Sequence, residues 1–126
     1  FCDENKDNDD MAQFTAPLMQ HVKQWGELTT EIGKQAAENP EAVGAAAVDY
    51  LYFSGYVTVA YLWARMALVA QTELANGNSE QAFYDAKVKT AQFYFAKLLP
   101  RTATHAQRIG TGVAPYMSMD VEQFAF

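Results

Sequence analysis

The hydrophobic pattern of the chain centres on residues 50–71, YLYFSGYVTVAYLWARMALVAQ, in which Arg65 is the only charged side chain. Two apolar stripes at helical spacing pass through this run, whereas an amphipathic helix in a small bundle needs only one. The second stripe therefore predicts a further surface that normally packs against this helix. One stripe is Val43, Ala47, Tyr50, Ser54, Val57, Tyr61, Ala64 and Leu68, and the other is Phe53, Tyr56, Ala60, Trp63, Ala67, Ala70 and Leu74.

The same run is long enough to be considered as a membrane span. As a helix rising ~1.5 Å per residue it measures about 33 Å, close to the ~30 Å hydrocarbon core of a bilayer. Arg65 alone costs roughly 2.5 to 3.5 kcal/mol near the middle of a bilayer. Four tyrosine hydroxyls in the run would also need partners in lipid. We therefore predict a central helix covered by protein, with membrane insertion disfavoured.

A first helix precedes this run. Its apolar positions keep an unbroken spacing of three or four residues, which predicts a helix capped by Asp9 or Asp10 and ending near Glu38. Pro17 interrupts the pattern and predicts either a kink or a restart with Thr15 as the cap. The apolar positions are Met11, Phe14, Leu18, His21, Trp25, Leu28 and Ile32.

Capping residues mark the other helix ends. Residues 39–41, Asn-Pro-Glu, predict the start of the second helix, and residues 76–77, Asn-Gly, predict its end after Ala75. Asn78 and Gln81 form a capping-box pattern that opens a third helix. Its stripe keeps one phase across Pro100, which predicts a single kinked helix. That stripe is Tyr84, Val88, Ala91, Phe95, Leu98, Thr102, His105 and Ile109; Gly110, Gly112 and Pro115 end the helix, and Asp120 caps a last turn through Gln123.

These elements predict an all-α fold, an up-down antiparallel bundle of three long helices, four if a proline splits one, plus a short C-terminal turn. A chain of 126 residues has the size of one domain. We assign residues 11–126 to that helical-bundle domain. Residues 1–10 carry five acidic residues and one lysine, and we predict them to be an acidic boundary segment.

The charges are distributed unevenly. Residues 1–41 hold nine acidic residues and three lysines, a net charge of −6, whereas residues 80–112 hold five basic and two acidic residues, a net charge of +3. The first and third helices therefore attract each other weakly or present solvated faces. The overall net charge of −6 argues against a nucleic-acid partner. The single Cys2 cannot form an internal disulfide, which fits a reducing compartment.

The sequence contains few groups suited to catalysis. His21 and His105 fall on apolar stripes, but no Glu-x-x-His pair occurs and no acidic residue lies on either inward stripe. We therefore predict that each histidine is satisfied by a neighbouring hydroxyl or carbonyl group. The chain has no nucleophile elbow, phosphate loop or dinucleotide fingerprint. We predict no catalytic, metal-binding or cofactor-binding residue in it.

The functional signal that remains is an apolar surface in need of a partner. The partner is predicted to be the remainder of the same protein or a second copy. Arg65, set among apolar neighbours, is predicted to pair with a carboxylate or with helix-end carbonyls across that interface. The interface candidates are Tyr52, Phe53, Tyr56, Trp63, Arg65, Phe93 and Tyr94.

Three segments carry a resemblance to a known family. They are residues 50–67, which end in WARMA, residues 83–109, which contain FYFAKLLP, and the closing MSMDVEQFAF. Together they resemble the extra C-terminal helical domain of a subgroup of bacterial acyl-CoA dehydrogenases that includes enzymes similar to methylmercaptopropionyl-CoA dehydrogenase. The resemblance covers roughly residues 11–126.

The resemblance implies a packing module that lies on the dehydrogenase core of its parent enzyme and contributes to homo-oligomer contacts. That parent would bind FAD and oxidise an acyl-CoA to the 2,3-enoyl form, with a glutamate removing the α-proton and flavin N5 accepting the β-hydride. The family's catalytic and flavin-binding segments have no counterpart here, so acyl-CoA is expected to bind only elsewhere in the parent. We expect this chain alone to be inactive and to reside in the bacterial cytoplasm.

A second hypothesis stays open from the residues alone. The chain is then a free-standing helical bundle that binds a ligand or works next to a membrane. Its central helix would line an apolar cavity or enter lipid.

Overall fold

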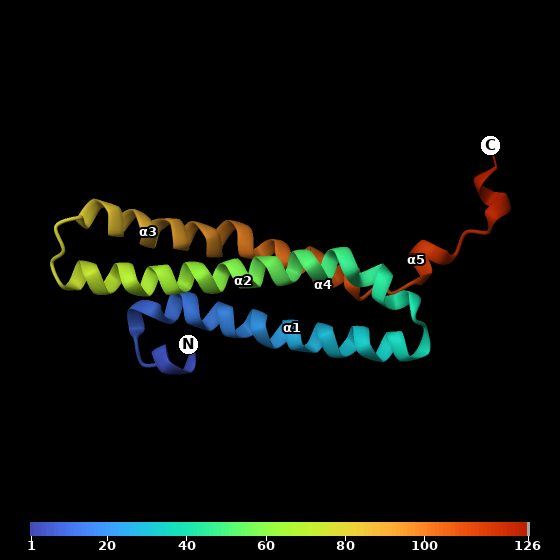
Figure 1. Cartoon of the computed structure of the whole chain (residues 1–126), viewed down its shortest axis with the longest axis horizontal. Coiled ribbons are helices and arrows are strands. Elements are labelled where there is room, and N and C mark those ends of the chain that lie inside the picture. Colours follow the sequence, from blue (N-terminus) through green and yellow to red (C-terminus); the bar gives the residue numbers. More distant parts are fainter. Residues whose placement is uncertain (126) are drawn as a thin grey trace.

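The computed structural model describes residues 1–125, and in this part of the chain every regular element is helical. The long helices α1 (Ala12–Glu38) and α2 (Glu41–Ala75) run antiparallel, and α3 (Gln81–Phe93) with α4 (Thr102–Ile109) returns along α2 (Figure 1). The predicted all-α up-down bundle is confirmed. Short 3₁₀ helices at Asp3–Asn5, Asp9–Met11 and Val121–Phe124, together with α5 (Ala114–Met117), complete the described chain.

The helix α1 begins at Ala12, directly after the 3₁₀ turn Asp9–Met11, and passes through Pro17 without a break. Its N-terminal turn is capped by Asn8, whose side-chain oxygen accepts the backbone N–H of Asp10 at 3.1 Å, so the predicted cap at Asp9 or Asp10 is wrong. The predicted restart at Thr15 is also wrong. The Thr15 hydroxyl is buried and donates to the Met11 carbonyl, one helical turn earlier, at 3.2 Å. Thr15 is therefore an interior residue of the helix and not its cap.

The ends of α2 follow the capping residues. The Asn39 side chain accepts the backbone N–H of Glu41 at 3.0 Å, which confirms the predicted start. At the other end Gly77 has a φ of 72°, and the Asn78 N–H bonds to the Glu73 carbonyl at 3.1 Å. This is the left-handed helix end that glycine permits and that Asn-Gly predicted.

The returning path is helical throughout but not regular. A π-helical turn at Tyr94–Leu98 and a 3₁₀ turn at Leu99–Arg101 separate α3 from α4. The π turn inserts one extra residue into the helical register. Tyr94 and Leu99 are the most buried side chains there, in place of the predicted Phe95 and Leu98. The predicted single path across Pro100 holds, and its phase departs from the prediction only in the π and 3₁₀ turns, since Ala91, Thr102 and Ile109 of the predicted stripe are buried.

The core lies between α2 and its two neighbours, and α2 contributes mostly small side chains to it. Alanine lets α1 and α3 approach the α2 backbone closely. The buried face of α2 is neither predicted stripe: it takes members from both and includes Ala42, Ala46 and Asp49, which belong to neither. It consists of Ala42, Ala46, Asp49, Phe53, Val57, Ala60, Ala64, Ala67 and Ala70, and Met11, Phe14, Leu18, Ala91, Tyr94 and Leu99 face it from other elements.

The N-terminal segment packs against the bundle. The Phe1 ring meets the Tyr61 ring edge-on with 5.6 Å between centroids, and Cys2 contacts the core. Burial raises the pKa of the Cys2 thiol, which keeps it protonated near neutral pH. The side-chain ion pairs of Lys23 and Lys89 lie within single helices. Across the described chain no ion pair joins α1 to α3 or α4, so the predicted charge asymmetry lies on solvated faces.

Candidate functional site

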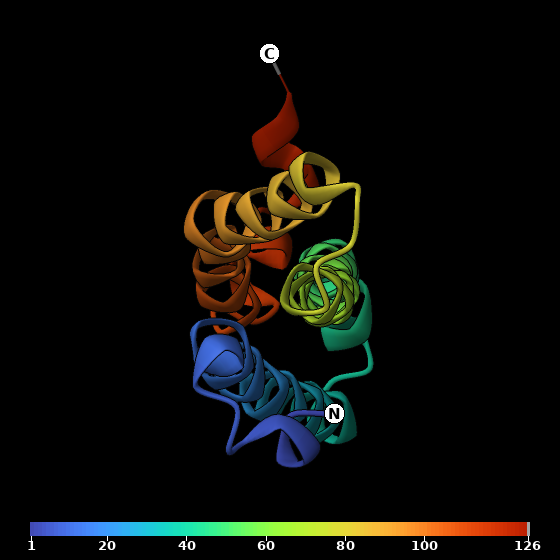
Figure 2. The ribbon, with the colours of Figure 1, turned by 90° about the vertical axis from the view of Figure 1, so that its left-hand side faces the viewer.

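The face of α2 that points away from the core is apolar and uncovered. Viewed along the bundle, α1 and α3 both lie on one side of α2, and the opposite side has no neighbouring helix (Figure 2). Leu51 is 71 % exposed and Val48 is 63 % exposed. We name this face the outer stripe, defined as Gly44, Val48, Leu51, Gly55, Val59, Leu62, Met66 and Val69, all of which are exposed.

The outer stripe is continuous and uncharged. From Gly44 to Val69 its members follow one another at intervals of three or four residues, so they lie on one side of the helix over about 37 Å. The two charged residues of α2 between Glu41 and Glu73 are Asp49, which is buried, and Arg65, which lies beside the stripe. A soluble surface with an apolar patch of this length is typical of an interaction site.

The two larger grooves beside the outer stripe lie on opposite flanks of α2. One, of about 520 Å³, lies between α2 and α3, and its rim carries the two cationic side chains Arg65 and Lys87. The other, of about 560 Å³, lies between α1 and α2, where the Thr29 hydroxyl and the Tyr50 hydroxyl share a hydrogen bond of 2.7 Å. Both grooves are open and lined mainly by carbon atoms, so the apolar surface extends beyond the stripe itself.

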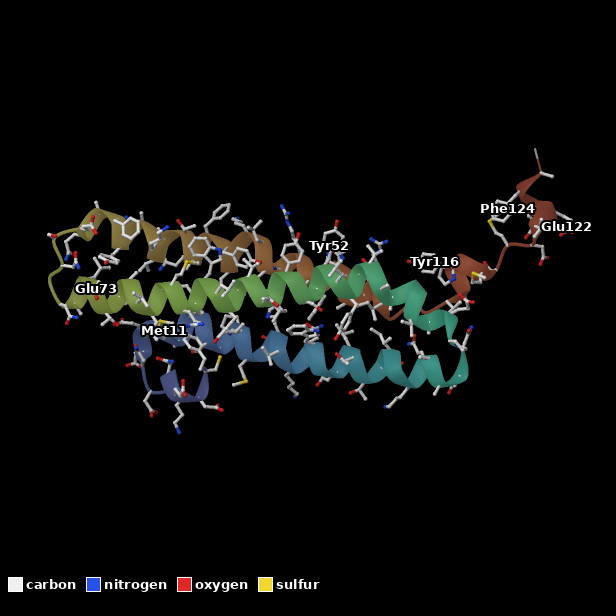
Figure 3. All side chains as sticks on the ribbon, viewed as in Figure 1. Met11, Tyr52, Glu73, Tyr116, Glu122 and Phe124 are labelled. Carbon is white, nitrogen blue, oxygen red and sulfur yellow. The ribbon has the colours of Figure 1, made fainter. Side chains whose placement is uncertain are left out.

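The predicted interface residues separate into surface and core. Tyr52 and Phe93 are more than half exposed, Arg65 is exposed, and Tyr56 and Trp63 are half-buried. Tyr52, labelled in Figure 3, lies beside α4, where its ring stacks on His105. For these five the interface role stays a prediction.

Phe53 and Tyr94 do not belong to a surface. Phe53 is fully buried because it lies on the α2 face that meets the core. Tyr94 is 6 % exposed because it lies one helical turn after the buried Ala91, on the side that meets α2, where its hydroxyl donates to the Tyr56 carbonyl at 2.9 Å. Their prediction as interface residues is therefore corrected to a role in the core.

Sequence reasoning concentrated on aromatic residues and missed the aliphatic members of the outer stripe. The spacing of the sequence could have identified them, since Val48, Leu51, Leu62, Met66 and Val69 fall on one helical face.

Arg65 has its guanidinium carbon 5.6 Å from the centre of the Tyr61 ring. The predicted pairing of Arg65 with a carboxylate or helix-end carbonyls across an interface stays a prediction.

A polar cluster joins α4 to α2 inside the bundle. The His105 Nδ1–H donates to the Asp49 carboxylate at 2.8 Å, and Arg108 Nε lies 3.4 Å from the other oxygen of that carboxylate. Asp49 is 3 % exposed, so the prediction that no acidic residue faces inward is wrong. His105 has a carboxylate partner where a hydroxyl or carbonyl was predicted. His21 does bond a carbonyl, that of Pro17 at 2.7 Å, as predicted.

Two tyrosines of α2 complete this cluster. The Tyr52 ring stacks on the His105 imidazole at 5.2 Å and 10°, and the Tyr56 ring does so at 5.9 Å and 28°. The arrangement fixes how α4 sits along α2 and neutralises the buried carboxylate. Within residues 1–125, no group of three or more His, Cys, Asp or Glu side chains is placed to hold a metal ion.

Burial raises the pKa of Tyr94 from 10.0 to about 12. Because the folded state favours the protonated phenol, this contribution to stability is complete below pH 10 and is lost as the pH rises toward 12. We expect the free energy of unfolding to fall in that window, as measured by urea denaturation. Tyr94→Phe should lower stability at neutral pH by about 0.5 to 1.5 kcal/mol and flatten the alkaline fall. An unchanged alkaline slope in this variant would contradict the assignment; Tyr52→Phe, at an exposed ring, serves as the control.

The only helix among the described residues that is long and apolar enough to cross a membrane is α2, by length and composition. One third of its most apolar window is buried inside the bundle. A core helix of a soluble protein has the same properties. The prediction against membrane insertion stays a prediction.

The fold and the site together define a helical-bundle domain with an exposed apolar face on α2. The chain belongs to the family described as acetyl-CoA dehydrogenase C-terminal like, whose model matches residues 1–120. A search of curated proteins finds no match to this chain. Membership confirms the resemblance at the level of a C-terminal domain of acyl-CoA dehydrogenases, and it implies a dehydrogenase core as the partner of such a domain.

Proposed function

We propose that this chain is a non-catalytic accessory domain of a FAD-dependent acyl-CoA dehydrogenase that packs on the catalytic core and supports oligomerisation. The parent enzyme is similar to the methylmercaptopropionyl-CoA dehydrogenase subgroup and acts in the bacterial cytoplasm. Its reaction is the α,β-dehydrogenation of an acyl-CoA thioester. Flavin and acyl-CoA bind to the core of the parent enzyme, and this domain contributes surface.

The observation that carries the proposal is the outer stripe. Burying apolar side chains stabilises a protein by about 25 cal/mol per Å² removed from water. Leu51, Leu62 and Val69 do not contribute this stabilisation fully in the isolated domain, because each side chain is 46 % exposed or more. A partner surface that covers them recovers it. The alternative of a free-standing ligand-binding bundle has less support, because the hollows beside α2 are open grooves.

A binding experiment tests the proposal. The purified chain is expected to lack the visible absorbance of a flavin and to leave acyl-CoA unoxidised. When it is added to the dehydrogenase part of its parent enzyme, produced without this domain, we expect a complex in gel filtration and a higher melting temperature of the dehydrogenase part. Flavin bound by the chain alone, or no complex with the dehydrogenase part, would refute the proposal.

Phe93 tests whether the aromatic side of the domain takes part in that complex. Its side chain is 58 % exposed, so Phe93→Ala should change the stability of the chain by about 0.5 kcal/mol or less. If Phe93 lies at the interface, its loss should weaken binding about tenfold, as measured by calorimetry. Thr90→Ala, at an exposed position one turn earlier on α3, is the matched control and should leave binding unchanged.

A further inference from the structure

We propose that the outer stripe of α2 is the face at which two copies of this chain meet, with the two α2 helices antiparallel across a two-fold axis that crosses the stripe between Gly55 and Val59. The inference deepens the oligomerisation part of the proposed function and rests on it in that respect. It names the surface and its occupant. Spacing, glycine placement and charge each support it.

The positions of the outer stripe are spaced almost symmetrically about its middle. Outward from its middle, Gly55 is matched by Val59, Leu51 by Leu62, Val48 by Met66, and Gly44 by Val69. A two-fold axis places each member of such a pair opposite its mate on the other copy, because an isologous interface joins a surface to itself. Leu51 then faces Leu62 and Val48 faces Met66, while Gly55 and Gly44 leave room for the valines opposite them.

Gly55 lies near the centre of the outer stripe. Nothing in the described part of the chain requires a glycine at this position. Glycine weakens a helix interior relative to alanine. A Cβ atom added at Gly55 meets no other atom within 4 Å, and the positive-φ glycines of the described chain are Gly77 and Gly112 only. A glycine at the crossing point of two helices lets their backbones approach closely. Gly33 in α1 is equally open but has Thr29 and Thr30 as helical neighbours, so it provides a control.

Charge favours the antiparallel arrangement over the parallel one. The groove beside the C-terminal half of the stripe carries Arg65 and Lys87. The groove beside its N-terminal half, of about 380 Å³, carries Glu41 together with the paired Asp49 and Arg108, a net charge of −1. Antiparallel docking sets the acidic end of one copy against the basic end of the other, whereas parallel docking opposes like charges.

Sedimentation equilibrium tests the interface. We expect the purified chain to form a dimer and Gly55→Leu to weaken its association at least tenfold, because the added side chain keeps the helices apart. Gly33→Leu makes the same change on an open face of α1 and should leave the dimer intact. Both variants should be at least as stable as the wild type in the monomer, since leucine is the better helix former, so a failure to fold is excluded. A monomeric wild-type chain, or a dimer unaffected by Gly55→Leu, would overturn the inference.

Single cysteines determine the direction of the helices. In a Cys2→Ser background, Thr58→Cys lies next to the proposed axis and should oxidise to a disulfide-linked dimer. Val48→Cys alone should not, because its copies are far apart, but mixed with Met66→Cys it should form a linked heterodimer. Efficient linkage of Val48→Cys to itself would overturn the antiparallel arrangement.

The Gly55→Leu variant also separates this inference from the proposed function. If the stripe joins two copies, this variant should still bind the dehydrogenase part of the parent enzyme. Loss of that binding in Gly55→Leu, with no dimer in the wild type, would assign the stripe to the dehydrogenase core, overturning the inference and sparing the proposed function. A wild-type dimer that does not bind the dehydrogenase part would support the inference and refute the proposed packing on the catalytic core.

Discussion

Phe53→Ala is expected to lower the free energy of unfolding by about 3 to 5 kcal/mol, because the variant loses a fully buried ring and leaves a cavity. The ring lies on the α2 face that meets both neighbouring helices, and most other members of that face are alanines or Val57. Small side chains nearby cannot fill the space that the ring vacates. Urea denaturation followed by circular dichroism measures the loss.

Leu51→Ala is the matched control, since Leu51 lies two residues earlier on the opposite face and is 71 % exposed. At concentrations at which the chain is monomeric, it should change stability by about 0.5 kcal/mol or less. The contrast between the two variants tests which side of α2 forms the core. Equal losses from both would mean that this assignment of the faces is wrong.

Asp49→Ala is expected to cost roughly 1.5 to 3 kcal/mol, because it removes a buried carboxylate that accepts a hydrogen bond from His105. Asp49→Asn keeps an acceptor for His105 and removes the charge. A smaller loss in Asp49→Asn than in Asp49→Ala would show how much of the effect belongs to the hydrogen bond. Both variants are measured by denaturation at neutral pH.

A double-mutant cycle isolates the contact itself. Combining Asp49→Ala with His105→Ala should reveal a coupling energy of about 0.5 to 3 kcal/mol, as for residues in direct contact. Arg108→Ala should cost about 1 kcal/mol or less, because its side chain is 56 % exposed and its charge is screened by water. Strict additivity of Asp49→Ala and His105→Ala would contradict the role of the pair in holding α4 on α2.

In the exposed C-terminal segment the local structure was predicted correctly from the sequence. The predicted cap at Asp120 is present, with the Asp120 N–H donating to the Gln123 side chain at 2.7 Å. Tyr116, Met117, Val121 and Phe124 are all more than half exposed on this segment, which extends away from the bundle (Figures 1 and 3). Capping is a local interaction between neighbours in sequence, so it can be predicted without the fold.

Burial was less predictable than helix ends. Both stripes predicted for α2 contained correct members, but the buried face drew on each, because a helix of 35 residues contacts α1 on one flank and α3 and α4 on the other. Asp49 was missed for a related reason. An acidic residue on an apolar face is stabilised only by partners that the fold brings to it, here His105 and Arg108, more than 50 positions away.

The sequence by itself determined the all-helical class, the ends of α2, and an excess of apolar surface on that helix, because capping and helical periodicity depend on residues a few positions apart. Only the tertiary structure decided which of those apolar residues are enclosed and which form the outer stripe. The π turn before Pro100 shifted the register so that Leu99 is buried in place of Leu98, and packing on two flanks selected the inner face of α2. Both outcomes depend on contacts between helices that are distant in sequence, and local patterns do not encode those contacts.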